Sequence, residues 1–169
     1  TSAEAALKYF TYGGVSSAFL LLGLSYLFGV IGKLDISQAI PIEEALVRAP
    51  MLVTVAYLFI MVGLGFKIAL APFHLWAPDV YQSAPTPAAA WIASGSKIAG
   101  VVLLLALLAP VSIPSAHTAI VPLLAAMAVV SMAVGNLGAL RQSNLKRLLA
   151  YSAIANAGYL LVAVVAFTE

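Results

Sequence analysis

Two lysines lie within long apolar stretches of the sequence, where a charged side chain is costly. Lys67 ends the run Tyr57-Leu-Phe-Ile-Met-Val-Gly-Leu-Gly-Phe-Lys67, and Lys97 begins the run Lys97-Ile-Ala-Gly-Val-Val-Leu-Leu-Leu105. A cation at the centre of a membrane span costs about 2.5–3.5 kcal/mol on insertion scales. Because charged residues at such depth mark ion and proton paths, the pair predicts a path for charge.

Pro72 predicts a break in the helix that carries Lys67. Proline lacks an amide hydrogen and clashes with the carbonyl four residues earlier, which here belongs to Ile68. Lys67 would lie roughly 24 Å along a helix that begins near Met51, deep in a bilayer. Carbonyls freed at a break favour a nearby cation, whereas burial disfavours the charge. A lysine between these two effects can gain and lose a proton.

Three further polar residues near the lysines are candidate proton relays. His74 follows Lys67 by one heptad and would share its face if the helix continued through Pro72. Imidazole titrates near neutral pH and can pass a proton. Ser94 and Ser96 flank Lys97 and could hold water beside it. Lys67 and Lys97 are therefore the predicted proton-carrying residues, with His74 and the two serines as possible relays.

Other interpretations of these residues remain open at this point. Either lysine could extend its side chain to the membrane interface, or form a permanent ion pair with an acidic residue of another helix. His74 could be a packing or interfacial histidine. Trp76, Tyr81 and Trp91 are interpreted as interfacial aromatic anchors.

The composition is that of a membrane protein. Of its 169 residues 63% are hydrophobic and 8% are charged, whereas soluble domains carry about 25% charged residues. Cysteine is absent, which excludes disulfides, thiolate metal sites and thiol chemistry in this sequence. The net charge of +2 comes from few residues, and there is no basic patch interleaved with aromatics that would predict binding to nucleic acid.

Long continuous apolar runs predict helices that cross the membrane, each about 20 residues long. We expect an all-α, polytopic bundle with about five spanning helices, one of them broken at Pro72. Residues 1–169 would form a single transmembrane domain. The predicted spans are Tyr9–Gly32, Met51–Pro78, Thr86–Leu108, Thr118–Leu140 and Leu148–Phe167.

The distribution of basic residues predicts the orientation. Cytoplasmic connections are enriched in lysine and arginine. The side of the N-terminus carries Lys8, Arg141, Lys146 and Arg147, and the opposite side carries Lys33 and Arg48. We therefore expect the N-terminal side to be cytoplasmic. The segment Asp79–Pro85 is predicted to be a turn, and Ala109–His117 to be a connection.

One long motif is specific enough to resemble a known family. The antiporter-like membrane subunits of respiratory complex I have a signature similar to Phe66-Lys-Ile-Ala-Leu-Ala-Pro-Phe-His-Leu-Trp-Ala-Pro-Asp-Val-Tyr-Gln-Ser-Ala-Pro-Thr-Pro87. Three more runs resemble the sixth, eighth and tenth helices of the subunit N type. They are Glu4-Ala-Ala-Leu-Lys-Tyr-Phe10, Ser94-Gly-Ser-Lys97 and Asn144-Leu-Lys-Arg-Leu-Leu-Ala-Tyr-Ser-Ala-Ile-Ala-Asn-Ala-Gly-Tyr159.

The resemblance implies that this chain is a fragment of an inverted-repeat fold of about fourteen helices. It would cover the sixth to the tenth helix. In the family the lysine of the broken helix carries protons, a role that transfers to Lys67. The lysine of the next helix links two half-channels, a role that transfers to Lys97. A partner glutamate and a further lysine of the relay would lie outside the fragment.

The function implied is proton translocation by a type I NADH:quinone oxidoreductase. The chain would be a non-redox subunit of this translocase, without a cofactor of its own. NADH, FMN, iron–sulfur clusters and quinone would bind other subunits. Its partners would be the other membrane subunits, including sister antiporter-like subunits, together with lipid, protons and internal water. The location would be the bacterial plasma membrane or an equivalent energy-transducing membrane.

Two alternatives are kept. The first is a subunit of an Mrp-type antiporter that exchanges cations for protons. The second is a structural membrane subunit whose lysines are held in ion pairs.

Overall fold

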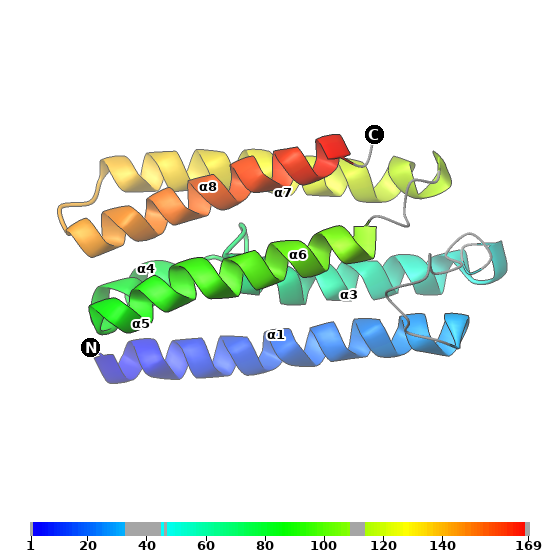
Figure 1. Cartoon of the computed structure of the whole chain (residues 1–169), viewed down its shortest axis with the longest axis horizontal. Helices are drawn as coiled ribbons and strands as arrows, with labels where there is room; N and C mark the ends of the chain where they lie inside the picture. Colours follow the sequence, from blue (N-terminus) through cyan, green and yellow to red (C-terminus); the bar gives the residue numbers. More distant parts are fainter. Residues whose placement is uncertain (1, 33–44, 46, 109–113, 168–169) are drawn as a thin grey trace.

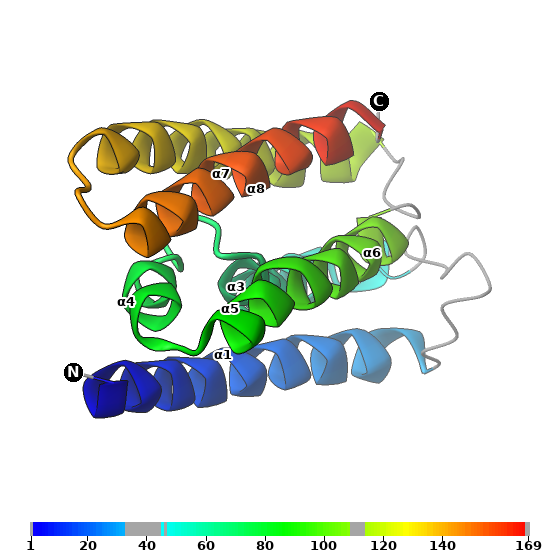
Figure 2. The same cartoon turned by 60° about the vertical axis from the view of Figure 1, so that its left-hand side comes forward.

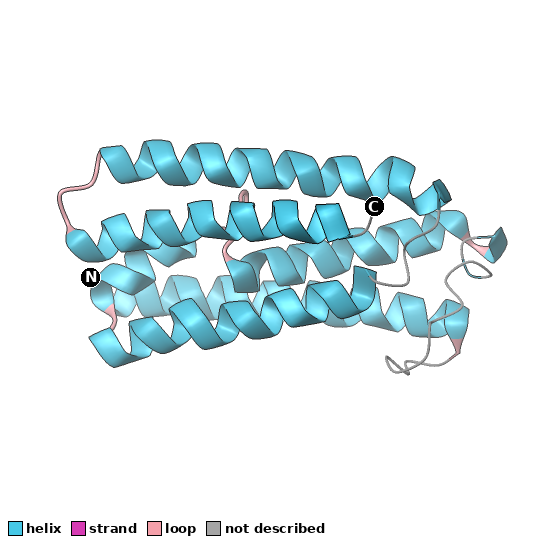
Figure 3. Ribbon diagram, turned by 45° about the horizontal axis from the view of Figure 1, so that its top comes forward, coloured by secondary structure: helices cyan, strands magenta, loops and turns pink. Residues whose placement is uncertain are grey.

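The chain folds as a bundle of long helices that run along one common axis (Figure 1). The computed structural model describes residues 2–32, 45, 47–108 and 114–167. Within these ranges there are helices and loops and no strand (Figure 3). The helices are α1 (Ser2–Ile31), α3 (Pro50–Ile68), α4 (Trp76–Ser83), α5 (Thr86–Trp91), the π-helical turn η1 (Ile92–Ser96), α6 (Lys97–Leu108), α7 (Pro114–Leu140) and α8 (Leu145–Phe167).

Five helical segments of the described chain are long and apolar enough to cross a membrane, as the sequence predicts. They are Ser2–Ile31, Pro50–Ile68, Thr86–Leu107, Val121–Leu140 and Leu145–Ala166. The third of these is continuous through α5, η1 and α6. The protein is therefore an integral, multi-pass membrane protein, and the predicted all-α bundle is confirmed.

Small residues bring the helices into close contact. This is usual in membranes, where the hydrophobic effect does not drive helices together and close packing holds them instead. A β-carbon on Gly63 of α3 would lie 2.5 Å from the Leu20 β-carbon of α1. A β-carbon on Gly135 of α7 would lie 2.5 Å from the Ala155 amide nitrogen of α8. Both distances are shorter than a β-carbon tolerates in proteins. The close packing of α1 on α3 and of α7 on α8 therefore requires glycine at these two positions.

The break beyond Lys67 is confirmed: it begins at Ala69, three residues before Pro72, and contains Pro72. Helix α3 ends at Ile68, and Ala69 takes a left-handed conformation with φ 61°. The Ala71–Pro72 peptide bond is cis. The residue before a proline is disfavoured in the α-region, so the chain leaves the helix before Pro72 is reached.

Helix α4 follows the break and replaces the turn that was predicted at Asp79–Pro85. Pro78 is tolerated because it lies in the first turn of α4, where amide hydrogens have no helical acceptor. Trp76 and Tyr81 are 2% and 5% exposed, so the prediction that they are interfacial anchors was wrong. Their rings pack against each other and, through Trp76, against Tyr9 and Phe66, which removes them from the surface. Trp91 is 75% exposed, and its role as an anchor stays a prediction.

Three helices begin earlier than the apolar runs do. Helix α1 begins at Ser2, α7 at Pro114 and α8 at Leu145, so part of the predicted connection Ala109–His117 is helical. At α8 the Asn144 side-chain oxygen accepts hydrogen bonds from the amides of Lys146 and Arg147, at 2.9 and 3.3 Å. This N-cap lets the helix begin three residues before the predicted span, which starts at Leu148.

Ser131 of α7 forms a hydrogen bond with the non-helical segment between α3 and α4. Its hydroxyl is fully buried, accepts a hydrogen bond from the Ala71 amide at 2.9 Å and donates to the Met127 carbonyl at 2.6 Å. The Ser131 hydroxyl thereby accepts a hydrogen bond from the Ala71 amide, which has no helical acceptor because the helix has ended.

Changing Ser131 to alanine is expected to destabilise the protein by about 1–3 kcal/mol, because the buried Ala71 amide loses its acceptor. Thermal unfolding of the detergent-solubilised full-length protein would measure the effect as a lower midpoint. Ser17→Ala on the exposed face of α1 is the matched control. An equal midpoint for both variants would show that the Ser131 hydroxyl does not hold the break.

Candidate proton-path site

Lys67 lies one residue before the end of α3, beside a hollow of about 350 Å³. The hollow is lined from α1 by Tyr9, Ser16 and Ser17, and from η1 by Ser96. The described residues leave the Lys67 side chain exposed, so the burial expected from its place in the run is not supplied by this part of the chain. Lys67 instead lines a hollow that hydroxyl-bearing side chains also line.

Two carbonyls near the end of α3 are engaged in hydrogen bonds within the protein. The Gly65 carbonyl accepts the Leu70 amide at 2.8 Å, and the Phe66 carbonyl accepts the Ala69 amide at 3.1 Å. The indole nitrogen of Trp76 also donates to the Phe66 carbonyl, at 3.1 Å. Backbone and indole donors therefore satisfy the Gly65 and Phe66 carbonyls, and Trp76 ties α4 to the residue that precedes Lys67.

Gly100 brings the two lysine-bearing spans together. A β-carbon on Gly100 of α6 would lie 3.3 Å from the Ile68 Cγ1 atom and 3.7 Å from the Lys67 Cβ atom. A larger residue would push α6 away from the end of α3. The helix that begins with Lys97 thus passes directly beside Lys67.

Lys97 is buried, with 8% of its surface exposed. Its Nζ atom donates a hydrogen bond to the Ala153 carbonyl of α8. It lines a second hollow of about 370 Å³ together with Ser94 and Asn156. Its nearest acceptor is therefore a neutral carbonyl on a neighbouring helix.

The two serines that precede Lys97 both lie in the π-helical turn η1 and line different hollows. Ser96 lines the hollow of Lys67, whereas Ser94 lines the hollow of Lys97. The Ser94 hydroxyl donates to the Ala90 carbonyl at 2.9 Å. Single π turns within helices often occur at functional sites. Here the turn places one hydroxyl in each hollow, which the sequence spacing alone did not indicate.

His74 lies in the segment between α3 and α4. Because α3 ends at Ile68, the helical face that His74 was expected to share with Lys67 does not exist. The ring is half-buried, and its Nδ1 atom has no hydrogen-bond partner among the described residues. It lines neither of the two hollows.

Asn156 is a polar residue of the site that the sequence analysis missed. It is exposed on α8, lines the hollow of Lys97, and lines a neighbouring hollow that extends to Lys146. A lone amide within the apolar run of α8 was the available signal, because an exposed carboxamide is disfavoured in lipid.

The arrangement has the groups that hold and pass protons. Two amines lie on touching helices, each beside a hydroxyl and a hollow large enough for water. Among the described residues no group of three or more His, Cys, Asp or Glu side chains could hold a metal ion. A bundle of spanning helices with a broken helix at the charged site is the architecture of ion-translocating membrane proteins.

Comparison with known proteins identifies the family. The family model for "NADH:quinone oxidoreductase/Mrp antiporter, TM" matches residues 1–169. The chain is 51% identical to NADH-quinone oxidoreductase subunit N 2 of Acidobacterium capsulatum, over 99% of this chain and 35% of that protein. It is 44% identical to subunit N of Geobacillus kaustophilus, over 95% of this chain and 34% of that protein. The chain therefore belongs to the antiporter-like membrane subunits of the NADH:quinone oxidoreductase/Mrp antiporter family.

Solved structures agree with this assignment. A chain of respiratory complex I from Thermus thermophilus matches with TM-score 0.77 and 42% identity, over 95% of this chain and 34% of that chain. A chain of the archaeal membrane-bound sulfane sulfur reductase matches with TM-score 0.85 and 33% identity, over 96% and 33%. The Mrp complex of Dietzia shares the fold, with TM-score 0.79 at 22% identity over 96% and 29%. The chain spans about a third of the length of these proteins, and the predicted resemblance is confirmed.

Proposed function

We propose that this chain is the central part of a proton-translocating, antiporter-like subunit of a type I NADH:quinone oxidoreductase. The observation that carries the proposal is the pair of lysines at the helix break. Lys67 and Lys97 lie on helices that touch at Gly100, each lysine beside its own hollow and its own serine hydroxyl. The similarity to proteins named subunit N supports the assignment to this enzyme.

The proposed proton path runs from the Lys67 hollow to the Lys97 hollow. The Lys67 ammonium releases a proton to water in its hollow when a neighbouring acidic group changes its charge or position. Water and the Ser96 hydroxyl carry the proton along η1, and Lys97 accepts it beside the Ala153 carbonyl. His74 remains a proposed relay, which its half-buried ring and unpartnered Nδ1 atom support.

In this function the chain contributes no redox centre. NADH, FMN, iron–sulfur clusters and quinone would be bound by other subunits, so this subunit takes part in the enzyme as a translocase. Residues 1–169 would act as one transmembrane domain, in contact with other membrane subunits of the complex, with lipid and with internal water. The absence of cysteine from the sequence supports this view, because iron–sulfur clusters are held mainly by cysteine thiolates.

The end of the bundle that holds the N-terminus is proposed to face the cytoplasm of a bacterial plasma membrane. The N-terminus and the turn between α7 and α8 lie at this same end (Figure 1). Lys8 belongs to the first third of α1, and Lys146 and Arg147 belong to the first turn of α8. Concentration of basic residues at one end supports the proposed orientation.

A cation/proton antiporter is the second candidate, because the family includes Mrp subunits. The two functions differ in what drives proton movement. Vesicles that carry the assembled complex are expected to move protons on addition of NADH and quinone at the same rate with Na⁺ and K⁺ replaced by choline. The external pH during turnover gives the rate, and an uncoupler provides the baseline. Proton movement that requires Na⁺ or K⁺, or that a Na⁺ gradient drives without NADH, would favour the antiporter.

A further inference from the structure

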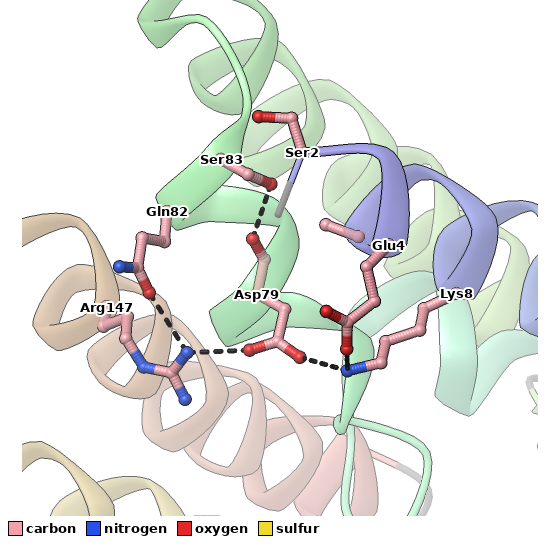
Figure 4. A pocket seen from close by; sticks show the side chains of 8 residues that line it. Ser2, Glu4, Lys8, Asp79, Gln82, Ser83 and Arg147 are labelled. Carbon is pink, nitrogen blue, oxygen red and sulfur yellow. Dashed lines mark hydrogen bonds and ion pairs between the residues drawn. The ribbon is translucent and has the colours of Figure 1, made fainter.

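Three helices that are far apart in the sequence meet at one carboxylate near the N-terminal end of the bundle (Figure 4). Asp79 of α4 accepts a hydrogen bond from the Lys8 ammonium of α1 at 3.0 Å, through Oδ2. Its other oxygen, Oδ1, accepts from the Arg147 guanidinium of α8 at 2.7 Å. We call this three-residue group the Asp79 clamp. It is the charged link between α4 and the helices on either side of it (Figure 2).

Two side chains outside the clamp contact its basic residues. Glu4 pairs with Lys8 at 2.8 Å within α1, and Gln82 accepts a second hydrogen bond from Arg147 at 3.1 Å. Burial alone would raise the pKa of the Asp79 carboxyl, but hydrogen bonds and charge from Lys8 and Arg147 lower it below its ordinary value. Asp79 is therefore an anion at neutral pH, with both oxygens engaged.

Helix α4 depends on such contacts for its position. It has only 8 residues, too few to be stable without tertiary packing. The chain before it is the non-helical segment at the break, and the helix after it begins at Thr86. What α4 touches therefore determines where it lies.

The clamp is connected to the helix end that carries Lys67. Trp76 begins α4, one turn before Asp79, and its indole donates to the Phe66 carbonyl. The Trp76 ring also packs on the Phe66 ring with centroids 5.0 Å apart. On the other side of the clamp, Tyr9 follows Lys8 and packs on Trp76, with ring centroids 5.1 Å apart. Trp76 on α4 and Tyr9 on α1 thus both connect the clamp to Phe66, the residue next to Lys67.

We propose that Asp79 is a positioning residue for the proton path, because its charge holds α4 between α1 and α8 and so fixes the end of α3 at Lys67. The inference rests on the proposed function for its activity readout. Asp79 touches none of the moving protons in this scheme. It acts through Trp76 and the Phe66 carbonyl.

The test combines hydrogen exchange with pumping in the assembled complex. Asp79→Asn removes the charge and keeps the shape. Glu4→Gln is the matched control, since it also takes a carboxylate away from Lys8 but leaves both hydrogen bonds of Asp79 in place. Asp79→Glu restores the charge. Amide exchange is measured by mass spectrometry on peptides covering residues 66–84, and protons per electron are measured in vesicles.

The expected result is faster exchange of residues 69–84 in Asp79→Asn, on the order of tenfold, because two charge-assisted hydrogen bonds are lost. The protons moved per electron should fall in the same variant. Glu4→Gln should leave both measurements near those of the unmodified protein, and Asp79→Glu should recover most of both. Exchange that is unchanged in Asp79→Asn would overturn the inference.

A Lys67→Ala variant measured in parallel separates this inference from the proposed function. If Lys67→Ala pumps normally, the proposed function fails, and the exchange data still decide whether Asp79 holds α4. If Lys67→Ala pumps poorly while Asp79→Asn exchanges faster and pumps normally, the positioning role is overturned. Lys8→Met is the second variant should Asp79→Asn not assemble. It releases only the α1 arm, and unchanged exchange of residues 69–84 in it would also contradict the inference.

Discussion

Replacing Lys67 with alanine is expected to lower the number of protons moved per electron while the complex still assembles. The Lys67 amine lies at the end of a broken helix beside a hollow lined by hydroxyl groups, and alanine has no group there that can carry a proton. Loss of a group that transfers protons commonly slows the step about 10²–10⁴-fold. We therefore expect the loss of this subunit's whole share of the pumping. The measurement is the proton-to-electron ratio of vesicles, with an immunoblot of the membrane subunits to confirm assembly.

Lys67→Arg is the decisive companion variant. Arginine keeps the positive charge but does not release its proton in proteins. If Lys67 carries protons, the arginine variant should assemble normally and pump as poorly as the alanine variant. If Lys67 only holds an ion pair, arginine should restore whatever alanine removes. Normal assembly with a normal ratio in both variants would reduce Lys67 to a surface cation.

Replacing Lys97 with methionine is expected to change function and stability in opposite directions. Methionine has a similar length and no charge, so it removes the buried ammonium from the hydrogen bond to the Ala153 carbonyl with little change in packing. The proton-to-electron ratio should fall because the second amine of the path is lost. The stability should stay equal or rise by about 1–2 kcal/mol, because a buried cation is costly in a membrane protein.

Ile98→Met is the matched control for Lys97→Met. Ile98 is the next residue of α6, lines the same hollow and is 64% exposed. Its variant should change neither the ratio nor the midpoint of thermal unfolding. A large loss of stability in Lys97→Met would indicate that the lysine holds α6 to α8, as the structural-subunit alternative requires. A normal ratio would remove Lys97 from the path.

The amino-acid sequence alone determined the membrane class, the helix type and the spans, and it predicts the two lysines of the proposed path. These features are local, since an apolar run long enough to cross a bilayer and a lysine within it can be recognised from neighbouring residues. Pro72 indicated the break because proline acts on its own helix. The motif from Phe66 to Pro87 indicated the family, because its residues are contiguous.

Only the tertiary structure decided which groups meet. Asp79 lies 71 residues from Lys8 and 68 from Arg147, and no local pattern indicates that these three charges share one site. Trp76 resembled an interfacial anchor by residue type, yet helix packing buries it against Phe66. Ser94 and Ser96 lie in the π-helical turn and line different hollows. Such pairings depend on how whole helices pack, because the free energy of a contact between distant residues arises only once the helices that carry them lie side by side.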